Sequence, residues 1–484
     1  MGCVFNTIES IIGFFWRTLV QRLPSKVRED GDIVAGASSR RIAMRRRPGM
    51  RAMAWIVALA LPLTAPVGCK KELAPGNDAK TITLQVWGHA GREAERATIE
   101  QQIQSFNSVH EDLRCELTLL PEGAYNAQVQ AAALAGELPD VLEFDGPYVY
   151  NYVWQGHLLP LDEYISSELR DNLLRSIIEQ GTYRDKLWSV GQYDSGLALF
   201  ARKSMLKAVE ARIPPSPDDA WTVDEFESIL GQLADNDDDG AVLDLKLNYR
   251  GEWFTYAFSP TLWSAGGGLI NRDDYASAKD ALNGAASVDA MHHIQSWILS
   301  SGYVDPNVDD YAFVGGRVAL SWVGHWEYRR YADAFGDDLM LIPLPDFGDG
   351  SRTGQGSWNW GITRNCAQPR AAMRFIEHLL ADENVLAMTS LNDAVPGTRS
   401  AAAKSSLHQE GGALHLYVEQ LQSGHAVPRP RTPAYPVITS VFRQAFDDIR
   451  HGADVRTVLD AAAEEIDLDI RDNEGYVSMP EDGV

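Results

Sequence analysis

Strand and helix patterns alternate through residues 81–144, and this order constrains the fold more than any other feature of the sequence. Alternating apolar and polar residues predict strands at 81–87 and 114–120, and 141–144 predicts a short third strand. Helical spacing predicts a helix at 93–109, and an Ala-rich helix follows at 125–135. Because consecutive strands joined through helices run parallel, we predict an α/β fold with crossover helices.

Ligands of an open parallel sheet collect beyond the carboxyl ends of its strands. The first strand ends at Trp87-Gly88-His89, and the third ends at Glu143-Phe144-Asp145-Gly146. Asp145 directly follows a buried strand, with Glu143 on the same face. We therefore expect Trp87 and Asp145 to lie at a ligand site.

Later segments of the chain continue the mixture of helices and strands. Thr222 is a candidate N-cap with Glu225 three residues on, and Gly266-Gly267-Gly268 predicts a sharp turn. Further patterns predict strands at 318–322 and 358–363, a helix at 369–381 and two helices within 437–470.

Charge is distributed unevenly along the 484 residues, whose formal net charge is −24. Residues 1–68 carry 10 Lys and Arg against 4 Asp and Glu, whereas residues 69–484 carry 33 against 63, a net charge of −30. An acidic body repels phosphate backbones, so we expect no nucleic-acid partner. The length is enough for two or three globular units.

The basic head has the organisation of an export signal. Arg45, Arg46, Arg47 and Arg51 precede an uncharged stretch at 52–68 that is short for a membrane span. It ends at Ala65-Pro66-Val67-Gly68-Cys69, which resembles a bacterial lipobox, although Pro66 stands where Leu is usual. The resemblance implies a lipoprotein signal peptide at 44–68 and acylation of Cys69; the alternative is a simple cleaved signal with Cys69 incidental.

We expect residues 69–79 to be a tether and residues 1–43 to be a non-native extension upstream of a true start at Met44 or Met50. The protein is then exported and held on the membrane by a lipid anchor. Cys115 and Cys366 remain in the body, either as a disulfide or as two buried free thiols.

Nine segments in order carry a resemblance to a known family. They are TITLQVWGHA, GELPDVLEFD, QGHLLPLDEYI, YRDKLWSVGQYDSGLALFARKSML, WTVDEFESIL, LWSAGGGLIN, FVGGRVALSWVGHW, GSWNWGIT and DAVPGTRSA. Their order over residues 80–470 is similar to that of the extracellular solute-binding proteins of carbohydrate ABC transporters, the maltose-binding-protein-like group. Ala201-Arg202-Lys203 departs from the family's usual Tyr-Asn-Lys, and we expect no functional consequence.

The resemblance implies a two-lobed periplasmic-binding-protein-like fold, with crossing hinge strands and a ligand cleft between the lobes. One lobe would hold residues 80–190 and 361–405, and the other residues 191–357 and 410–475. It further implies a monomeric lipoprotein that captures a small carbohydrate by lobe closure and delivers it to the transmembrane subunits of an ABC permease, without being an enzyme.

Aromatic residues are the first candidates for contacts with such a ligand. A sugar ring packs its C–H face on an aromatic ring, while in-plane polar groups bind its hydroxyls. The resemblance implies that the segments holding Trp263, Trp326, Trp358 and Trp360 line the cleft. The aromatic candidates are Trp87, Trp263, Trp326, Trp358 and Trp360; the others are Asp145, Tyr193, Asp194 and Arg399. The alternative for each is core packing, a helix cap or a surface ion pair.

An Asp-rich segment, Asp235-Asn236-Asp237-Asp238-Asp239-Gly240, resembles the start of a calcium loop. Asp235, Asp237 and Asp239 stand at positions 1, 3 and 5, with Gly240 at the turn. Position 12 is Lys246 rather than Glu, so the segment is either a weak Ca²⁺ site or a solvated turn. No other cofactor is expected.

Other functions remain open at this point. The sequence lacks the G-x-S-x-G, H-E-x-x-H and P-loop motifs. An exported polysaccharide-active hydrolase that uses Glu143 or Asp145 is the alternative from a different class. A sugar sensor for a membrane receptor, or a binding protein for glycerol phosphate or a peptide, would share the predicted fold.

Overall fold

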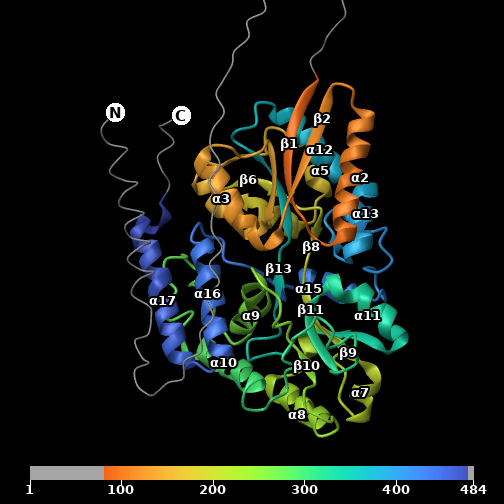
Figure 1. Ribbon diagram of the computed structural model, residues 1–484, viewed down its shortest axis with the longest axis vertical. Helices are drawn as coiled ribbons and strands as arrows, with labels where there is room; N and C mark the ends of the chain where they lie inside the picture. Colours follow the sequence, from red (N-terminus) through yellow and green to blue (C-terminus); the bar gives the residue numbers. More distant parts are fainter. Residues whose placement is uncertain (1–80, 478–484) are drawn as a thin grey trace, which may run out of the picture. The chain divides into compact units, whose positions relative to one another are not determined.

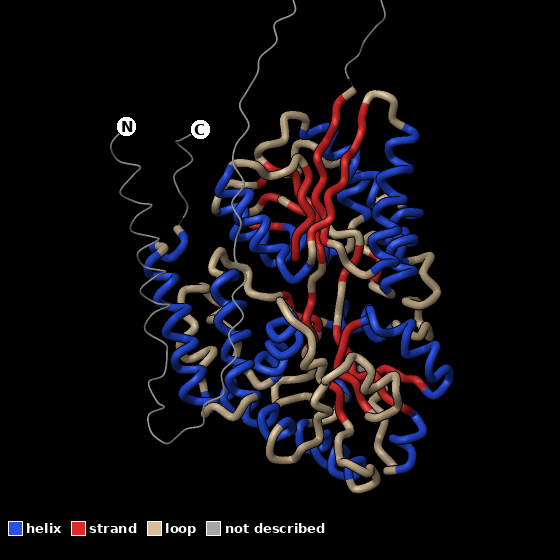
Figure 2. Tube along the Cα trace, in the orientation of Figure 1, coloured by secondary structure: helices blue, strands red, loops and turns tan. Residues whose placement is uncertain are grey.

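A six-stranded sheet forms the centre of the first lobe (Figures 1 and 2). The computed structural model describes residues 81–477, which belong to one structural unit; the predicted upstream extension, signal peptide, tether and Cys69 lie outside the described residues. The strand order is β2-β1-β3-β14-β4, and β7 also pairs with β14. These strands are β1 (Ile82–His89), β2 (Leu113–Leu120), β3 (Val141–Asp145), β4 (Leu158–Leu159), β7 (Ser189–Val190) and β14 (Trp358–Thr363).

The predicted crossover arrangement is confirmed. β1 pairs in parallel with both β2 and β3, and the connections contain α2 (Glu93–Val109) and α3 (Tyr125–Ala135). β14 is antiparallel to β3, because it enters this sheet from the second lobe. The carboxyl ends of β1 and β3 therefore open toward the same edge of the sheet.

Helices cover both faces of this sheet (Figure 1). On one face, apolar residues of α2, α12 (Pro369–Leu379) and α13 (Asp382–Asn392) pack on Leu84, Val86 and Val141. On the other face, α3 and α4 (Val149–Trp154) pack on Leu142 and Phe144. Neighbouring residues of β3 thus enter different cores, as strand alternation requires.

The second lobe is built on a four-stranded sheet with the order β10-β11-β9-β12. β11 runs parallel to β10, and both β11 and β12 run antiparallel to β9. The predicted strand at 318–322 is β11, displaced by two residues. The four strands are β9 (Leu197–Arg202), β10 (Leu243–Asp244), β11 (Leu320–Gly324) and β12 (Leu339–Ile342).

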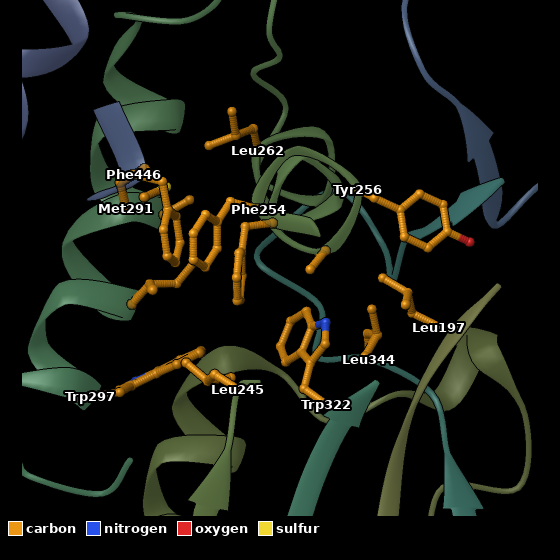
Figure 3. Close-up of a cluster of buried hydrophobic side chains, with 14 of the residues drawn as sticks. Leu197, Leu245, Phe254, Tyr256, Leu262, Met291, Trp297, Trp322, Leu344 and Phe446 are labelled. Atoms are coloured by element: carbon orange, nitrogen blue, oxygen red, sulfur yellow. The ribbon is translucent and has the colours of Figure 1, made fainter. Parts of the chain in front are cut away.

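Large aromatic side chains fill the core of the second lobe (Figure 3). Phe446 stacks on Phe254 with ring centroids 4.7 Å apart, and Trp297 and Trp322 are buried nearby. Every residue of α9 is buried, so this helix has no polar face from which its periodicity could be recognised. The helices of this lobe include α8 (Val223–Ala234), α9 (Trp253–Ser264), α10 (Ala285–Ile298), α16 (Tyr435–Arg450) and α17 (Val455–Asp472).

Two pairs of short strands connect the lobes. β8 (Tyr193–Asp194) pairs antiparallel with β15 (Val395–Pro396) and continues into β9. β13 (Thr353–Gln355) pairs in parallel with β16 (Ala426–Pro428) and leads into β14. The predicted two-lobed α/β fold with crossing hinge strands is therefore confirmed, whereas the exact lobe limits stay predictions.

Several local predictions also agree with the structure. Thr222 caps α8, since its hydroxyl accepts the Glu225 N–H at 3.2 Å. Gly266 turns the chain after α9 with a φ of +83°. Cys115 and Cys366 are buried free thiols. Between residues 81 and 477, no helix is long and apolar enough to span a bilayer.

The remaining elements are short and connect the main strands and helices along the sequence. They are α5 (Ser167–Asn172), α6 (Arg175–Gly181), β5 (Thr182–Tyr183), β6 (Lys186–Leu187), α7 (Lys203–Ala208), α11 (Tyr328–Phe335), α14 (Arg399–Ala402), α15 (His415–Ser423) and the 3-10 turns η1 (Glu122–Ala124), η2 (Gly146–Tyr148), η3 (Pro217–Asp219), η4 (His325–Glu327), η5 (Gly336–Asp338) and η6 (Glu474–Tyr476).

Candidate ligand-binding site

A cleft of about 810 Å³ lies where the two lobes and the crossing strands meet. His89 and Asp145, the last residues of β1 and β3, line its first-lobe wall. The segment before α9 and the turn η4 line its second-lobe wall. The cleft thus lies at the strand ends where an α/β sheet places its ligands.

Four of the nine predicted binding residues line this cleft. Asp145 and Trp358 come from paired positions of β3 and β14, Tyr193 comes from β8, and Trp326 comes from η4. The structure therefore brings together side chains from both lobes and from a crossing strand. Their contact with a ligand stays a prediction.

The other five predicted residues lie outside the cleft lining. Trp263 is buried under the Arg272 guanidinium, which is 4.4 Å from its ring centre. Trp360 packs edge-on against Phe375 in the first-lobe core. Trp87 packs on the α3 side of the sheet, and Arg399 begins α14. Asp194 ends β8, one of the crossing strands.

Asp194 is fully buried and holds the crossing strands together. One of its carboxylate oxygens accepts the N–H of Ser195 at 2.8 Å and that of Gly356 at 3.1 Å. Ser195 follows β8 and Gly356 follows β13, so the carboxylate ties one crossing segment to the other. This contact gives Asp194 a structural role at the hinge.

A buried ion pair forms the floor of the cleft. Arg429, just after β16, donates two hydrogen bonds of 2.6 Å to the two carboxylate oxygens of Asp145. Arg429 also lies 3.4 Å from Glu252, the residue before α9. Burial lowers the pKa of Arg429, but Asp145 together with Tyr435 and Glu252 outweighs it and raises the pKa well above its usual value. Sequence reasoning missed Arg429, which lies in the Pro-rich segment 428–433 without a motif to mark it.

Glu252 connects this floor to both lobes. Its carboxylate accepts hydrogen bonds from the hydroxyls of Tyr148 at 2.9 Å, Tyr435 at 2.6 Å and Thr439 at 2.9 Å. Tyr148 belongs to the first lobe, whereas Tyr435 and Thr439 belong to α16. Burial, followed by the charge of Asp145, raises the pKa of Glu252. A single carboxylate therefore joins elements on either side of the cleft.

Trp326 forms the main aromatic surface of the second-lobe wall. Its ring lies over Gly324, where an added Cβ would approach the ring to 2.1 Å. Trp253 meets it edge-on at 6.1 Å, and Tyr256 lies tilted against it at 6.3 Å. The ring is thus seated by its neighbours before any ligand contact.

Trp358 is held differently, because His89 covers one of its faces. The two rings stack 3.9 Å apart at an interplanar angle of 6°. The Nδ1 atom of His89 lies 2.8 Å from the carboxylate of Glu143. Burial lowers the pKa of His89, but Glu143 together with the charges of Glu95 and Glu122 outweighs it, and the pKa rises from 6.5 to about 9. At neutral pH the cleft therefore contains a cationic ring stacked on tryptophan.

A second histidine, His325, lies on the opposite wall in its neutral form. Its Nδ1 is 2.6 Å from the Asn392 carbonyl oxygen, which can only accept, so Nδ1 carries the proton. Ser195 then donates to Nε2 at 2.9 Å, and the Tyr256 hydroxyl donates to Ser195 at 3.0 Å. Burial lowers the pKa of His325 to about 4. These bonds link the crossing segment to η4.

The Asp-rich segment forms a turn that binds its own backbone. Asp237 accepts the N–H groups of Asp239 and Gly240, each at 3.1 Å, and Asp239 accepts the N–H of Ala241. Within residues 81–477, no group of three His, Cys, Asp or Glu residues is arranged to hold a metal ion. A Ca²⁺ ion on Asp235, Asp237 and Asp239 stays an untested prediction.

Two lobes joined by paired crossing strands, with a polar and aromatic cleft between them, define a two-lobed solute-binding protein. A family model described as bacterial extracellular solute-binding protein matches residues 101–413, and the chain belongs to this family.

Individual relatives are distant but similar over most of their length. An uncharacterized lipoprotein of Streptomyces antibioticus is 23% identical over 425 residues, covering 83% of this chain and 90% of the relative. The maltodextrin-binding protein of Bacillus subtilis is 22% identical over 394 residues, covering 78% and 86%. The crystal structure of the cyclic α-maltosyl-1,6-maltose binding protein of Arthrobacter globiformis has a TM-score of 0.66 at 22% identity, covering 81% of this chain and all of that one.

The floor ion pair leads to a prediction about stability. Replacing Asp145 by Asn should lower the free energy of unfolding by about 3–5 kcal/mol, because it leaves the buried Arg429 charge poorly compensated. Urea unfolding followed by circular dichroism measures this loss. Asp112→Asn is the matched control, since Asp112 pairs with Arg374 on the surface and should cost far less. Equal losses in the two variants would show that the floor pair has no special importance.

The His89 pair leads to a prediction about pH. Because folding raises the pKa of His89 from 6.5 to about 9, its contribution to stability is complete below about pH 6.5 and is lost as the pH rises through about 9. The difference in unfolding free energy between wild type and His89→Gln should therefore shrink by about 3 kcal/mol over this range. In a Glu143→Gln background the difference should depend much less on pH; the same dependence with and without Glu143 would contradict the assignment.

Proposed function

We propose that the protein is the substrate-binding component of an ABC importer, and that it captures an uncharged sugar or oligosaccharide between its lobes. The observation that carries the proposal is that two buried carboxylates at the cleft are paired with cationic side chains. At its floor, Asp145 is neutralised by Arg429, and Glu143 by His89. The lining also has aromatic surface, such as that of Trp326, beside further polar and charged side chains, among them Glu122 and Arg250. Aromatic faces flanked by hydrogen-bonding groups suit a polyhydroxylated ring.

The named relatives support the same class of ligand. The Bacillus subtilis relative is a maltodextrin-binding protein, and the Arthrobacter globiformis structure is that of a cyclic maltosyl-maltose binding protein. Closure of the two lobes would bring Trp326 and the first-lobe wall onto opposite sides of the solute. The closed form would then dock on the transmembrane subunits of the permease.

A hydrolytic function is less well supported by the geometry. Glu143 and Asp145 are the carboxylates that a hydrolase would need, but each is held by a cationic partner. Arg429 binds both carboxylate oxygens of Asp145 and His89 binds one of Glu143, so these oxygens are not free to act on a sugar. The Ser195–His325 contact offers a nucleophile beside a base, but a histidine with a pKa of about 4 is a weak base. We therefore propose that the protein binds its solute without converting it.

The sugar proposal predicts a thermal shift with a defined dependence on the cleft. Tight binding stabilises the folded state by about 2.7 kcal/mol at a sugar concentration of one hundred times Kd. A panel of mono- and oligosaccharides should contain at least one that raises the Tm of the wild type. The same sugar should bind Trp326→Ala at least about tenfold more weakly, a loss of about 1.4 kcal/mol.

Trp154→Ala is the matched control for Trp326→Ala. Trp154 is also half-buried, but it packs on Tyr476 away from the cleft. Its replacement should leave sugar affinity unchanged. No shift with any sugar, or equal losses of affinity in the two variants, would count against a sugar site at Trp326.

The export proposal places a lipid anchor on Cys69. The name of the Streptomyces antibioticus relative as a lipoprotein supports it, as does membership of an extracellular family. In bacteria grown with radiolabelled palmitate, we expect label in the wild type and in Cys115→Ser, and none in Cys69→Ser. The Cys69→Ser protein should also leave the membrane fraction. Equal labelling of Cys69→Ser would disprove the anchor.

A further inference from the structure

Arg92 crosses from the first lobe to the second. It is the N-cap residue of α2, three residues after the end of β1. One guanidinium nitrogen donates to the carbonyl oxygen of Trp326 at 2.9 Å, and another donates to the carboxylate of Glu327. Both acceptors lie in η4 of the second lobe. Arg92 therefore contacts the turn that carries the main aromatic surface of the cleft.

The carboxylate of Glu327 is already held in place by second-lobe residues when it accepts the hydrogen bond from Arg92. The Glu327 side chain is fully buried, and it also accepts hydrogen bonds from the Tyr249 hydroxyl at 2.9 Å and from Arg330 at 3.3 Å. Burying a carboxylate is costly unless several donors satisfy it. Tyr249 and Arg330 belong to the second lobe, so they hold the carboxylate in place whether or not the first lobe is close.

The ion pairs continue from Glu327 into the second-lobe core. Arg330 pairs with Asp310 at 3.0 Å, Asp310 with Lys246 at 2.8 Å, and Lys246 with the buried Asp244 at 3.0 Å. Charges of alternating sign thus run from a buried strand to the cleft. Arg92 is the last member of this series and the one that comes from the other lobe.

We propose that Arg92 is a latch that holds the lobes closed and fixes the turn that carries Trp326. It acts as a positioning residue, because its two bonds go to η4. This inference rests on the proposed function, since it explains how a captured solute is retained. The contacts of Arg92 that hold the lobes closed therefore also position the ring of Trp326.

The latch should act on dissociation more than on association. Its bonds form when η4 and the start of α2 meet, so they stabilise the closed form, with or without a solute, and must break before a bound solute can leave. Losing them should speed release of a bound sugar about tenfold and change the association rate less than twofold. Because the Arg92 side chain is about half exposed, at 47%, salt should weaken its bonds and speed release from the wild type.

The first measurement uses no sugar. Small-angle X-ray scattering of the purified full-length protein should give a larger radius of gyration for Arg92→Ala than for the wild type. Arg92→Lys, which keeps the charge but loses the paired donors, should lie between them. Arg96→Ala is the matched control, since Arg96 is exposed one turn further along α2. It should match the wild type.

The second measurement follows release of maltotriose, used as the probe, by stopped-flow tryptophan fluorescence. Faster release from Arg92→Ala than from Arg96→Ala, together with the larger radius without sugar, supports the latch. Faster release with an unchanged radius would mean that Arg92 contacts the sugar directly, and the latch would be overturned. An unchanged radius and unchanged release would overturn it as well.

The two measurements separate the latch from the sugar proposal. If no sugar of the panel, maltotriose included, binds while the Arg92→Ala radius increases, the latch stands and the proposed ligand class fails. If maltotriose binds while every variant has the radius of the wild type, the ligand stands and the latch fails. Circular dichroism of Arg92→Ala and Arg92→Lys should match that of the wild type and checks that both variants are folded.

Discussion

The buried pair of Arg429 and Asp145 is the interaction on which the cleft depends. Arg429 comes from a crossing segment, Asp145 from the end of a first-lobe strand, and Glu252 reaches the same guanidinium from the second lobe. A buried guanidinium needs such partners, because removing it from water without them is costly. The three side chains therefore fix the floor of the cleft at the point where both lobes meet, and the walls are placed relative to that floor.

The same physical rule explains the rest of the cleft. Where a charge is buried, as at Glu143 and Glu327, bonds from other segments of the chain satisfy it. Those bonds join strand ends, turns and crossing strands to one another. The same polar groups therefore position the aromatic rings, as His89 does when it bonds Glu143 and stacks on Trp358. Ring surface such as that of Trp326 faces the cleft beside polar and charged side chains, among them Glu122 and Arg250, and this mixture suits a polyhydroxylated solute.

Much of the fold could be predicted because its signals are local. The bounds of α2 and α3 follow from apolar spacing and from Gly136, and the parallel pairing follows from their positions between strands. Helix α9 escaped prediction because it is buried on all sides and shows no periodic pattern. The site was harder to predict than the fold. Trp358 lines the cleft, whereas Trp360, two residues further along the same strand, packs in the first-lobe core. Only the packing of the folded lobes distinguishes these two positions. Arg429 could not be predicted from a local pattern, because its partner Asp145 lies 284 residues away in the sequence.

The central claim is that a solute is held between the lobes against Trp326. The most direct test is X-ray diffraction from crystals grown with a sugar that raises the Tm. We expect density for that sugar between the two walls of the cleft, with one ring face on Trp326 and polar contacts from both lobes. Density for the sugar outside the cleft, with none between the lobes, would contradict it.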